Sequence, residues 1–258
     1  MTLLNYIWRL IATGLSFALF GLGGLIIGLL IIPIGALFCR KREKRIRFTR
    51  GTIGMAMRSF IEFMRLTGVL RYRVSGLEHV KPGDNYLILA NHPSLIDVVF
   101  LLAWFPQAVC VVKQAIFENT FTRHVVSLAE YISNHDPGIM LTESVARLNK
   151  GRSLILFPEG TRTTPGQPLV FQQAASVIAF RSDTQCLPVL IRVKPTTLTK
   201  ENRWYQIPQQ QVFFRMTIEQ PLRPTDLMTD IAAVRRPDRQ FNRYLHDYFS
   251  ARLAQKPS

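Results

Sequence analysis

Two short segments of the sequence contain side chains suited to acid–base chemistry. In Asn91-His92-Pro93-Ser94-Leu95-Ile96-Asp97, an imidazole and a carboxylate lie five positions apart. In Phe157-Pro158-Glu159-Gly160-Thr161-Arg162, an acid and an arginine flank a glycine. A neutral imidazole removes protons, a neighbouring carboxylate orients its ring, and an arginine binds an anion through two parallel hydrogen bonds. Together the segments indicate proton abstraction beside an anion-binding pocket.

The spacing between imidazole and carboxylate is not decisive by itself. His79 and Asp84 have the same spacing, but a Pro-Gly pair lies between them and we interpret them as part of a turn. His92 instead lies between the apolar run 86–90 and the helix-like stretch 94–104. Such a junction is where α/β folds place their sites. We favour a functional His92, although a histidine merely hydrogen-bonded at a strand end would leave the same pattern.

The two segments resemble the sequence marks of the glycerolipid acyltransferases, whose best-known members are the 1-acyl-glycerol-3-phosphate acyltransferases. These marks are Asn-His-x-Ser-x-x-Asp and, about sixty to seventy residues later, Phe-Pro-Glu-Gly-Thr-Arg. Both are complete here and occur in that order. The resemblance covers roughly residues 74–193. It includes Lys113 and the run 187–190, which is similar to the family's fourth block.

The resemblance implies an acyl transfer reaction, and the residues give it a mechanism. His92 is the expected general base, with Asp97 orienting its ring and stabilising the imidazolium. By resemblance, Lys113 is expected to help stabilise the oxyanion. The resemblance also implies that Glu159, Gly160, Thr161 and Arg162 bind the acceptor.

The expected reaction moves a fatty acyl group from an acyl thioester, acyl-ACP or acyl-CoA, to a hydroxyl of a lysophospholipid-like acceptor. A thiol is a good leaving group, so no covalent enzyme intermediate is required, and we expect no cofactor and no metal. The chain lacks the Gly-x-Ser-x-Gly motif of ordinary ester hydrolases. A thioesterase and a non-catalytic lipid-binding membrane scaffold remain as alternatives.

Two positions depart from the family pattern. Members that form phosphatidic acid usually carry Ile-x-Arg between the two motifs, and this chain has Asn134 where the arginine would stand. After the second motif the family commonly shows Phe-Lys-x-Gly, whereas this chain reads Phe171-Gln172-Gln173-Ala174. Each lost contact to a phosphate costs about 1.5–3 kcal/mol. A non-phosphate lipid acceptor, of the aryl-polyene-lipid or ornithine-lipid type, is therefore the second hypothesis.

The composition favours a membrane surface over nucleic acid as the anionic partner. The chain has 258 residues and a formal net charge of +15. Seven basic residues and one acidic residue fall between Arg40 and Arg50, directly after an apolar segment. This pattern is typical of a cluster facing the anionic cytoplasmic leaflet. Nucleic-acid signatures are missing from the sequence, and three widely spaced cysteines predict no disulfide framework.

The apolar segment is long enough to form a membrane helix. No charged residue lies between Arg9 and Arg40, and about twenty apolar residues cross a bilayer. The positive-inside rule predicts that Arg40 and the catalytic domain lie on the cytoplasmic face of the inner membrane, with the amino terminus outside. A re-entrant hairpin that never crosses is the alternative.

The chain is expected to divide into a membrane anchor at 1–40, a basic cluster with an amphipathic interfacial helix at 41–69, and an acyltransferase domain at 70–258. The amphipathic stripe has either of two roles, packing in the core or lying in the membrane interface. It consists of Ile53, Met57, Phe60, Ile61 and Met64.

From residue 70 onward, strand-like and helix-like patterns alternate. This order predicts an α/β fold with a mixed, largely parallel sheet flanked by helices. Strands are expected at 71–74, 86–90, 109–113, 153–157, 187–193 and 212–218. Helices are expected at 94–104, with Pro93 in the first turn and Ser94 as its cap, and at 117–129, 139–150 and 171–181. A last helix at 226–255 is expected to place one apolar side inward, consisting of Leu227, Ile231, Val234, Phe241, Leu245 and Phe249.

Overall fold

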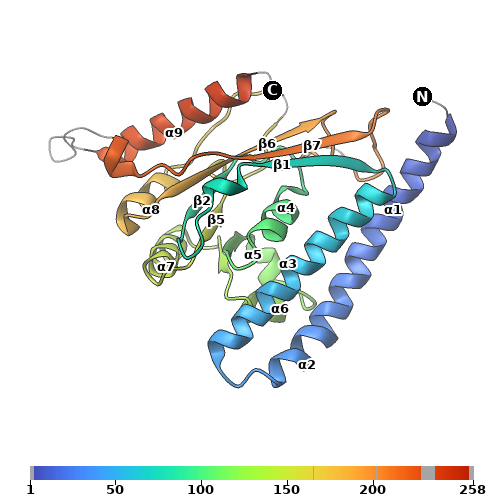
Figure 1. The fold of residues 1–258 in the computed structure, drawn as a ribbon, viewed down its shortest axis with the longest axis horizontal. Coiled ribbons are helices and arrows are strands. Elements are labelled where there is room, and N and C mark those ends of the chain that lie inside the picture. Colours follow the sequence, from blue (N-terminus) through green and yellow to red (C-terminus); the bar gives the residue numbers. More distant parts are fainter. Residues whose placement is uncertain (1–2, 165, 202, 228–235, 256–258) are drawn as a thin grey trace.

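In a computed structural model of the protein, a seven-stranded sheet forms the centre of the described chain, which is residues 1–258 without 1–2, 165, 202, 228–235 and 256–258. The strand order is β1-β7-β6-β2-β5-β3-β4 (Figure 1). Every pairing is parallel except the antiparallel pair β6–β7. The mixed, largely parallel sheet predicted from the sequence is confirmed. The strands are β1 Leu70–Ser75, β2 Leu87–Ala90, β3 Val109–Val112, β4 Ile132–Ser133, β5 Leu154–Leu156, β6 Cys186–Lys194 and β7 Val212–Ile218.

Helices cover both faces of the sheet, and several of them differ from the predicted ranges. The predicted helix 94–104 begins only at Asp97, and the predicted helix 117–129 is two short helices. In the predicted last helix, Ile231 and Val234 lie outside the described residues, whereas Phe241, Leu245 and Phe249 are buried as expected. The helices are α1 Leu3–Ile26, α2 Ile32–Leu37, α3 Arg42–Leu66, α4 Asp97–Trp104, α5 Gln114–Glu118, α6 Arg123–Leu128, α7 Pro137–Asn149, α8 Ala174–Ser182 and α9 Pro237–Ala254.

The core has two layers, one on each face of the sheet. All four residues of β2 are buried, and their side chains alternate between the layers. Ile88 faces the layer that α3 and α4 cover, whereas Leu89 faces the layer beneath α8 and α9. A central parallel strand covered on both faces reads as a continuous apolar run, which is why 86–90 was recognisable in the sequence.

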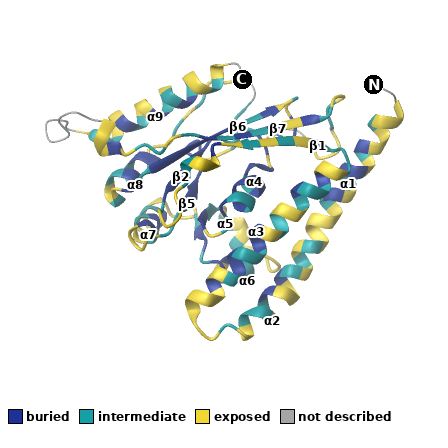
Figure 2. Ribbon diagram, in the orientation of Figure 1, coloured by how far each residue is buried: buried dark blue, intermediate teal, exposed yellow. Residues whose placement is uncertain are grey.

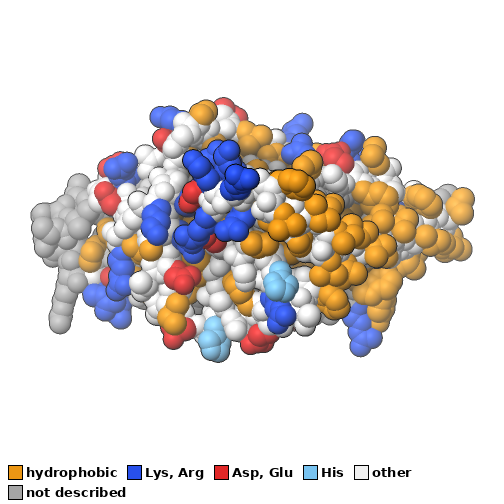
Figure 3. All heavy atoms as spheres, turned by 90° about the horizontal axis from the view of Figure 1, so that it is seen from below, with side chains coloured by type: hydrophobic (Ala, Val, Ile, Leu, Met, Phe, Trp, Pro, Cys, Tyr) orange, Lys and Arg blue, Asp and Glu red, His pale blue; other side chains and the backbone are white. Residues whose placement is uncertain are grey.

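The amino-terminal helices pack along the domain as a hairpin. α1, a π-helical segment Ile27–Ile31 and α2 follow one another as one long helical arm, and α3 runs back beside it (Figure 1). Leu3–Leu37 is the one helical stretch of the described residues that is long and apolar enough to cross a membrane, by length and composition alone. Much of its outer side is exposed (Figure 2) and forms a continuous hydrophobic surface (Figure 3).

Both ends of this hairpin contact the same domain. The Trp8 indole donates to the Thr67 carbonyl at 2.9 Å, and the Arg9 guanidinium donates to the Pro208 carbonyl at 3.0 Å. Farther along, Gly28 packs so closely against Val125 that an added Cβ would lie 3.0 Å from that side chain. The domain thus contacts residues 8 and 9 directly, and the expected placement of the amino terminus across the membrane stays a prediction.

The amphipathic stripe of α3 belongs to the core. Ile53, Ile61 and Met64 are buried in the layer beneath α3, and Met57 and Phe60 pack against it. Of the two roles expected for the stripe, core packing is confirmed and the interfacial role of this stripe is wrong. The basic residues before it mostly point outward, and Figure 3 shows Lys and Arg side chains gathered beside the hydrophobic surface.

Candidate functional site

The site lies where the parallel strands end, and an amide side chain positions its first residue. β2 ends at Ala90. The Asn91 side chain then donates to the Ile191 carbonyl at 2.8 Å and accepts from the Ile191 N–H at 2.7 Å. These two bonds continue the pairing of β2 with β6 for one more residue. His92 therefore leaves the sheet edge at a fixed point.

His92 and Asp97 form the pair predicted from the sequence. The His92 Nδ1 and the Asp97 Oδ2 are 2.8 Å apart. The same oxygen accepts the Ser94 N–H at 2.7 Å, so the aspartate closes the turn that precedes α4. Ser94 does not cap the helix as predicted, because its hydroxyl donates instead to the Thr197 carbonyl at 3.1 Å.

The environment of Asp97 makes it an unusual carboxylate. The residue is completely buried, and desolvation raises its pKa from the ordinary 3.8 to about 6, against the opposing effect of His92. Its Oδ1 has no hydrogen-bond partner among the described residues. Because Oδ2 accepts from Nδ1, the neutral imidazole carries its proton there and Nε2 remains as the basic nitrogen.

Phe157, the first residue of the second motif, packs flat against the imidazole. The two ring centroids are 4.1 Å apart and the planes are inclined by 19°. Phe157 directly follows β5, which neighbours β2 in the sheet, so the two motifs leave adjacent strands at the same edge. The sequence indicated Phe157 only as part of the second motif. Its stacking on His92 depends on β2 and β5 being neighbours in the sheet, which the sequence did not predict.

Glu159 joins the two motifs through hydrogen bonds. Its buried carboxylate accepts the His92 N–H at 2.9 Å and the Thr163 hydroxyl at 2.7 Å. The Thr163 N–H in turn donates to the His92 carbonyl at 2.8 Å. The structure thus gives Glu159 contacts with protein, and its expected role in acceptor binding stays a prediction.

Arg162 lies beside the base and is held by the loop that follows β6. Its Nη1 donates to the carbonyls of Leu198 and Thr199 at 3.0 and 2.9 Å. Gly160 has a positive φ of 68°, which an L-residue adopts only with strain and which gives the motif its turn. Thr161 is exposed at the outer side of this turn.

The remaining predicted residues stand along the same sheet edge, farther from the base. Lys113 follows β3 and is exposed, and it makes no hydrogen bond or ion pair with any described residue of the site. Asn134 lies next to it and accepts the Gln114 N–H at 3.2 Å. Gln172 packs against the second motif, with its Cγ 3.5 Å from where a Cβ on Gly160 would stand. Both neutral positions therefore border the site.

The second His-x4-Asp pattern is structural, as expected. The Nδ1 of His79 lies 2.9 Å from the Ile218 carbonyl, whereas Asp84 accepts from the Tyr86 hydroxyl at 3.1 Å. Burial raises the pKa of the Cys110 thiol to about 12 and also raises that of Cys186. These two thiols are core residues. Across the described ranges, no three His, Cys, Asp or Glu side chains form a group that could hold a metal.

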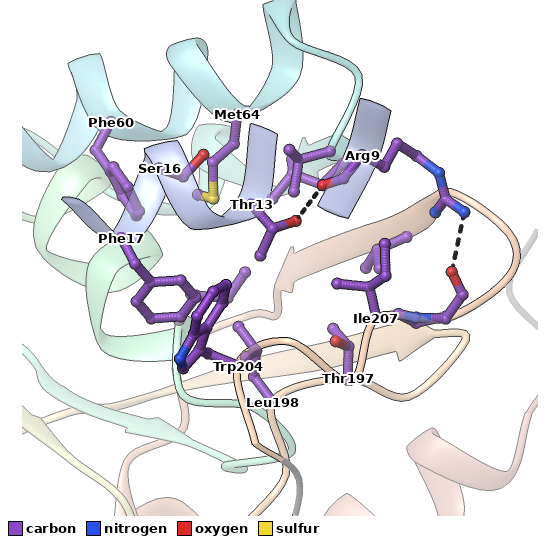
Figure 4. Close-up of a pocket in the computed structure, with 15 residues that line it drawn as sticks. Arg9, Thr13, Ser16, Phe17, Phe60, Met64, Thr197, Leu198, Trp204 and Ile207 are labelled. Atoms are coloured by element: carbon purple, nitrogen blue, oxygen red, sulfur yellow. Dashed lines mark hydrogen bonds between the residues drawn. The ribbon is translucent and has the colours of Figure 1, made fainter. Parts of the chain in front are cut away.

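A small apolar cavity of about 40 Å³ lies between α1, α3 and the loop after β6 (Figure 4). Phe17 and Trp204 face each other across it with ring centroids 6.1 Å apart. Two residues of the site also line this cavity. They are Ile96, from the turn of the first motif, and Leu198, whose carbonyl accepts a hydrogen bond from Arg162. The cavity thus connects the hairpin to the site, which the sequence did not indicate.

Comparison with known proteins shows what this chain is similar to. Residues 71–192 match the sequence model of the Acyltransferase family. These residues, a little under half of the chain, are similar to the acyltransferases. A 1-acyl-sn-glycerol-3-phosphate acyltransferase of Helicobacter pylori is 32% identical over 138 residues, which are 50% of this chain and 56% of that protein. One from Pseudomonas aeruginosa is 28% identical over 131 residues, or 48% of this chain and 51% of the relative.

The glycerolipid acyltransferase fold extends beyond the aligned sequences. The crystal structure of the 1-acyl-sn-glycerophosphate (LPA) acyltransferase from Thermotoga maritima superposes with a TM-score of 0.72, covering 98% of this chain and 100% of that one. At 19% identity this likeness shows the fold. The sequence matches span about half the length of the curated relatives.

Proposed function

We propose that this protein is an acyltransferase of the 1-acyl-glycerol-3-phosphate type, which moves an acyl group from a thioester to a lipid hydroxyl. The observation that carries the proposal is the 2.8 Å contact between His92 Nδ1 and the buried Asp97. It leaves Nε2 as a base with a fixed orientation. The curated relatives named above support the substrate class.

In the proposed reaction, His92 Nε2 takes the proton of the acceptor hydroxyl as the oxygen attacks the thioester carbonyl. A tetrahedral oxyanion forms and collapses, which breaks the carbon–sulfur bond. The imidazolium then returns its proton to the leaving thiolate. Asp97 stabilises the imidazolium meanwhile without taking up the proton. The expected help of Lys113 with the oxyanion remains part of the proposal.

The acceptor's anionic group is proposed to bind at Arg162. Its Nη1 donates to two backbone carbonyls, which fix the guanidinium plane. Neither Nε nor Nη2 donates to a described protein atom. A guanidinium held in this way presents two donors with the spacing of phosphate oxygens. The neutral Asn134 and Gln172 favour a second candidate acceptor, a lipid hydroxyl without a phosphomonoester.

The exposed outer side of α1 is proposed to bind the bilayer. Because both ends of the hairpin contact the domain, we infer that it lies in one leaflet rather than crossing, which corresponds to the re-entrant alternative. The basic residues 40–47 then meet anionic headgroups on the cytoplasmic face of the inner membrane.

The decisive experiment measures thiol release by the purified protein in detergent, with an acyl thioester alone or with a panel of acceptors. Release that needs 1-acyl-glycerol-3-phosphate and yields the diacyl product by mass spectrometry supports the proposal. His92→Ala should abolish that release. Release without any acceptor would instead identify a thioesterase, and undiminished release by His92→Ala would overturn the mechanism.

A further inference from the structure

Three neighbouring strands concentrate positive charge on one face of the sheet. β1, β6 and β7 together contain five basic residues and no acidic residue. In the strand register, Arg73 is opposite Arg215 and Arg215 is opposite Arg192. Arg71 and Lys194 are both opposite Phe213. All five basic side chains therefore lie on the same face, which we call the basic face.

The basic face lies on the part of the sheet that the helices leave uncovered. The other side of β7 is buried in the core through Phe214 and Met216. Among the described residues, the carboxyl end of α9 reaches this side, where Arg192 donates to the carbonyls of Arg252 and Gln255, and buried residues of α9 share a core layer with Leu190 of β6. Figure 2 shows exposed positions along β1 and β7. Arg71, Arg73 and Lys194 are exposed, and Arg192 and Arg215 are half-buried.

This arrangement opposes folding stability. Like charges directly opposite each other on neighbouring strands are destabilising. Burial, and then the neighbouring Arg215, lower the pKa of Arg192. Glu219, at the end of β7, is the acid that acts against this effect, and it also lies 3.6 Å from Arg252. An anionic partner would complement the positive charge of this face.

The basic face borders the site through β6. Ile191, which holds Asn91, directly precedes Arg192, and the loop after Lys194 accepts hydrogen bonds from Ser94 and Arg162. The hydrophobic surface of α1 belongs to the hairpin on the opposite side of the sheet (Figure 1). If α1 binds the membrane as proposed, the basic face stays in water, where a soluble partner can reach it.

We propose that the basic face docks the acidic surface of a soluble carrier protein that presents the acyl thioester to His92. This inference rests on the proposed function and adds the donor's docking surface to it. The flat strand surface with spaced charges suits the face of another protein, because a small ligand such as coenzyme A is normally enclosed by a concave pocket. Opposite charges on two proteins also speed their encounter.

The test compares two donors that carry the same acyl chain, one linked to bacterial acyl carrier protein and one to coenzyme A. The variant Arg71→Glu/Arg73→Glu reverses two exposed charges. We expect kcat/KM with the carrier-protein donor to fall about tenfold or more, with less than about a twofold change for the coenzyme A donor. In the unmodified protein the carrier-protein value should also fall steeply with added salt.

Arg239→Glu/Arg243→Glu on α9 is the matched control, because it reverses two exposed charges outside the basic face and so changes the net charge equally. It should leave both donors unaffected. Equal losses with both donors, no loss with either, or an equal loss in Arg239→Glu/Arg243→Glu would each overturn the docking proposal. Failure of the proposed function is distinguishable, because the unmodified protein would then turn over neither donor with any acceptor.

Discussion

The two sides of the site differ in how firmly the protein holds them. On the base side, Asp97, Phe157 and Glu159 fix three different parts of His92: a ring nitrogen, the ring face and the backbone N–H. Each contact comes from a buried or half-buried group. In the proposed mechanism, this preorganised His92 would need little reorganisation to take up a proton.

On the acceptor side, fewer protein contacts hold the side chains. Arg162 is fixed through one nitrogen only, Lys113 is exposed, and Asn134 and Gln172 are neutral. The comparison teaches that the fold fixes His92 firmly, whereas the residues proposed to recognise the acceptor include exposed groups that a single substitution can change.

The largest effect is expected from a substitution that disables the His92–Asp97 pair without changing the size of the side chain. Asp97→Asn keeps the size of the side chain but removes the charge that orients and stabilises the imidazolium. We expect kcat to fall by about 10²–10⁴, measured as thiol release with saturating acceptor. Thermal unfolding provides the control. A variant that unfolds at much lower temperature would show that Asp97 acts on structure rather than on the base.

The pH dependence follows from the raised pKa of Asp97. Activity should fall as the pH is lowered through about 6, because protonation removes the acceptor for the His92 Nδ1–H. Stability changes in the opposite sense. The folded state binds this proton more tightly than the unfolded state, so the contribution of Asp97 to stability declines as the pH rises from about 4 to 6. Thermal unfolding of Asp97→Asn should lack this decline.

Breaking the acceptor side should affect substrate binding more than chemistry. Arg162→Ala removes a charged hydrogen-bond donor worth about 1.5–3 kcal/mol. The KM for 1-acyl-glycerol-3-phosphate should therefore rise about ten- to a hundredfold, with a smaller change in kcat. Arg162→Lys retains the charge and should recover only part of the loss. An unchanged KM in Arg162→Ala would exclude this residue as the anion-binding group.

A smaller effect is expected from removing the ring that packs against the base. Phe157→Leu keeps an apolar side chain but loses the stacking on His92. An aromatic pair contributes about 0.5–1.5 kcal/mol beyond its buried area, so kcat should fall about two- to tenfold. Phe157→Tyr retains the ring and should stay close to the unmodified rate. Equal rates for the leucine and tyrosine variants would count against a positioning role.

The smallest effect is a gain on the acceptor side. Gln172→Lys restores the basic residue common in the family, at an exposed position against the second motif. An exposed ion pair contributes about 0.2–1 kcal/mol, so kcat/KM for a phosphate acceptor should rise up to about fivefold. A lipid hydroxyl without phosphate should show no gain. Gln173→Lys, one residue farther along, is the matched control and should change neither acceptor.

The sequence predicted the sheet and the His92–Asp97 pair because both depend on local patterns. Runs of buried β residues are apolar along their length, and the motif residues lie close together in the chain. The predicted start of α4, residue 94, was wrong. The Asp97 carboxylate accepts the Ser94 N–H and so closes a turn before the helix. This turn depends on the contact between Asp97 and His92, which helix periodicity does not reveal. The split between α5 and α6 and the two-residue strand β4 are too short for periodicity to reveal.

Contacts between distant segments could not be predicted. Thr197, Leu198 and Thr199 frame the site through their carbonyl oxygens, which every residue type has, so no sequence pattern marks them. The hairpin contacts at Trp8 and Arg9 likewise depend on where the loop at 208 lies. Hydropathy indicates that the amino-terminal segment is apolar, but it contains no information about which side of it the domain covers.

The carboxylate of Glu159 has a consequence for how a protein with this site could change its acceptor. Glu159 accepts the His92 N–H, and the Thr163 N–H donates to the His92 carbonyl. Because Thr163 also donates to Glu159, the backbone of His92 and the turn that contains Arg162 are expected to move together. A substitution that moves the turn to fit a new headgroup would also move the base. New acceptor preferences are therefore expected to evolve at residues that border the site, such as 134 and 172, while the two motifs stay unchanged.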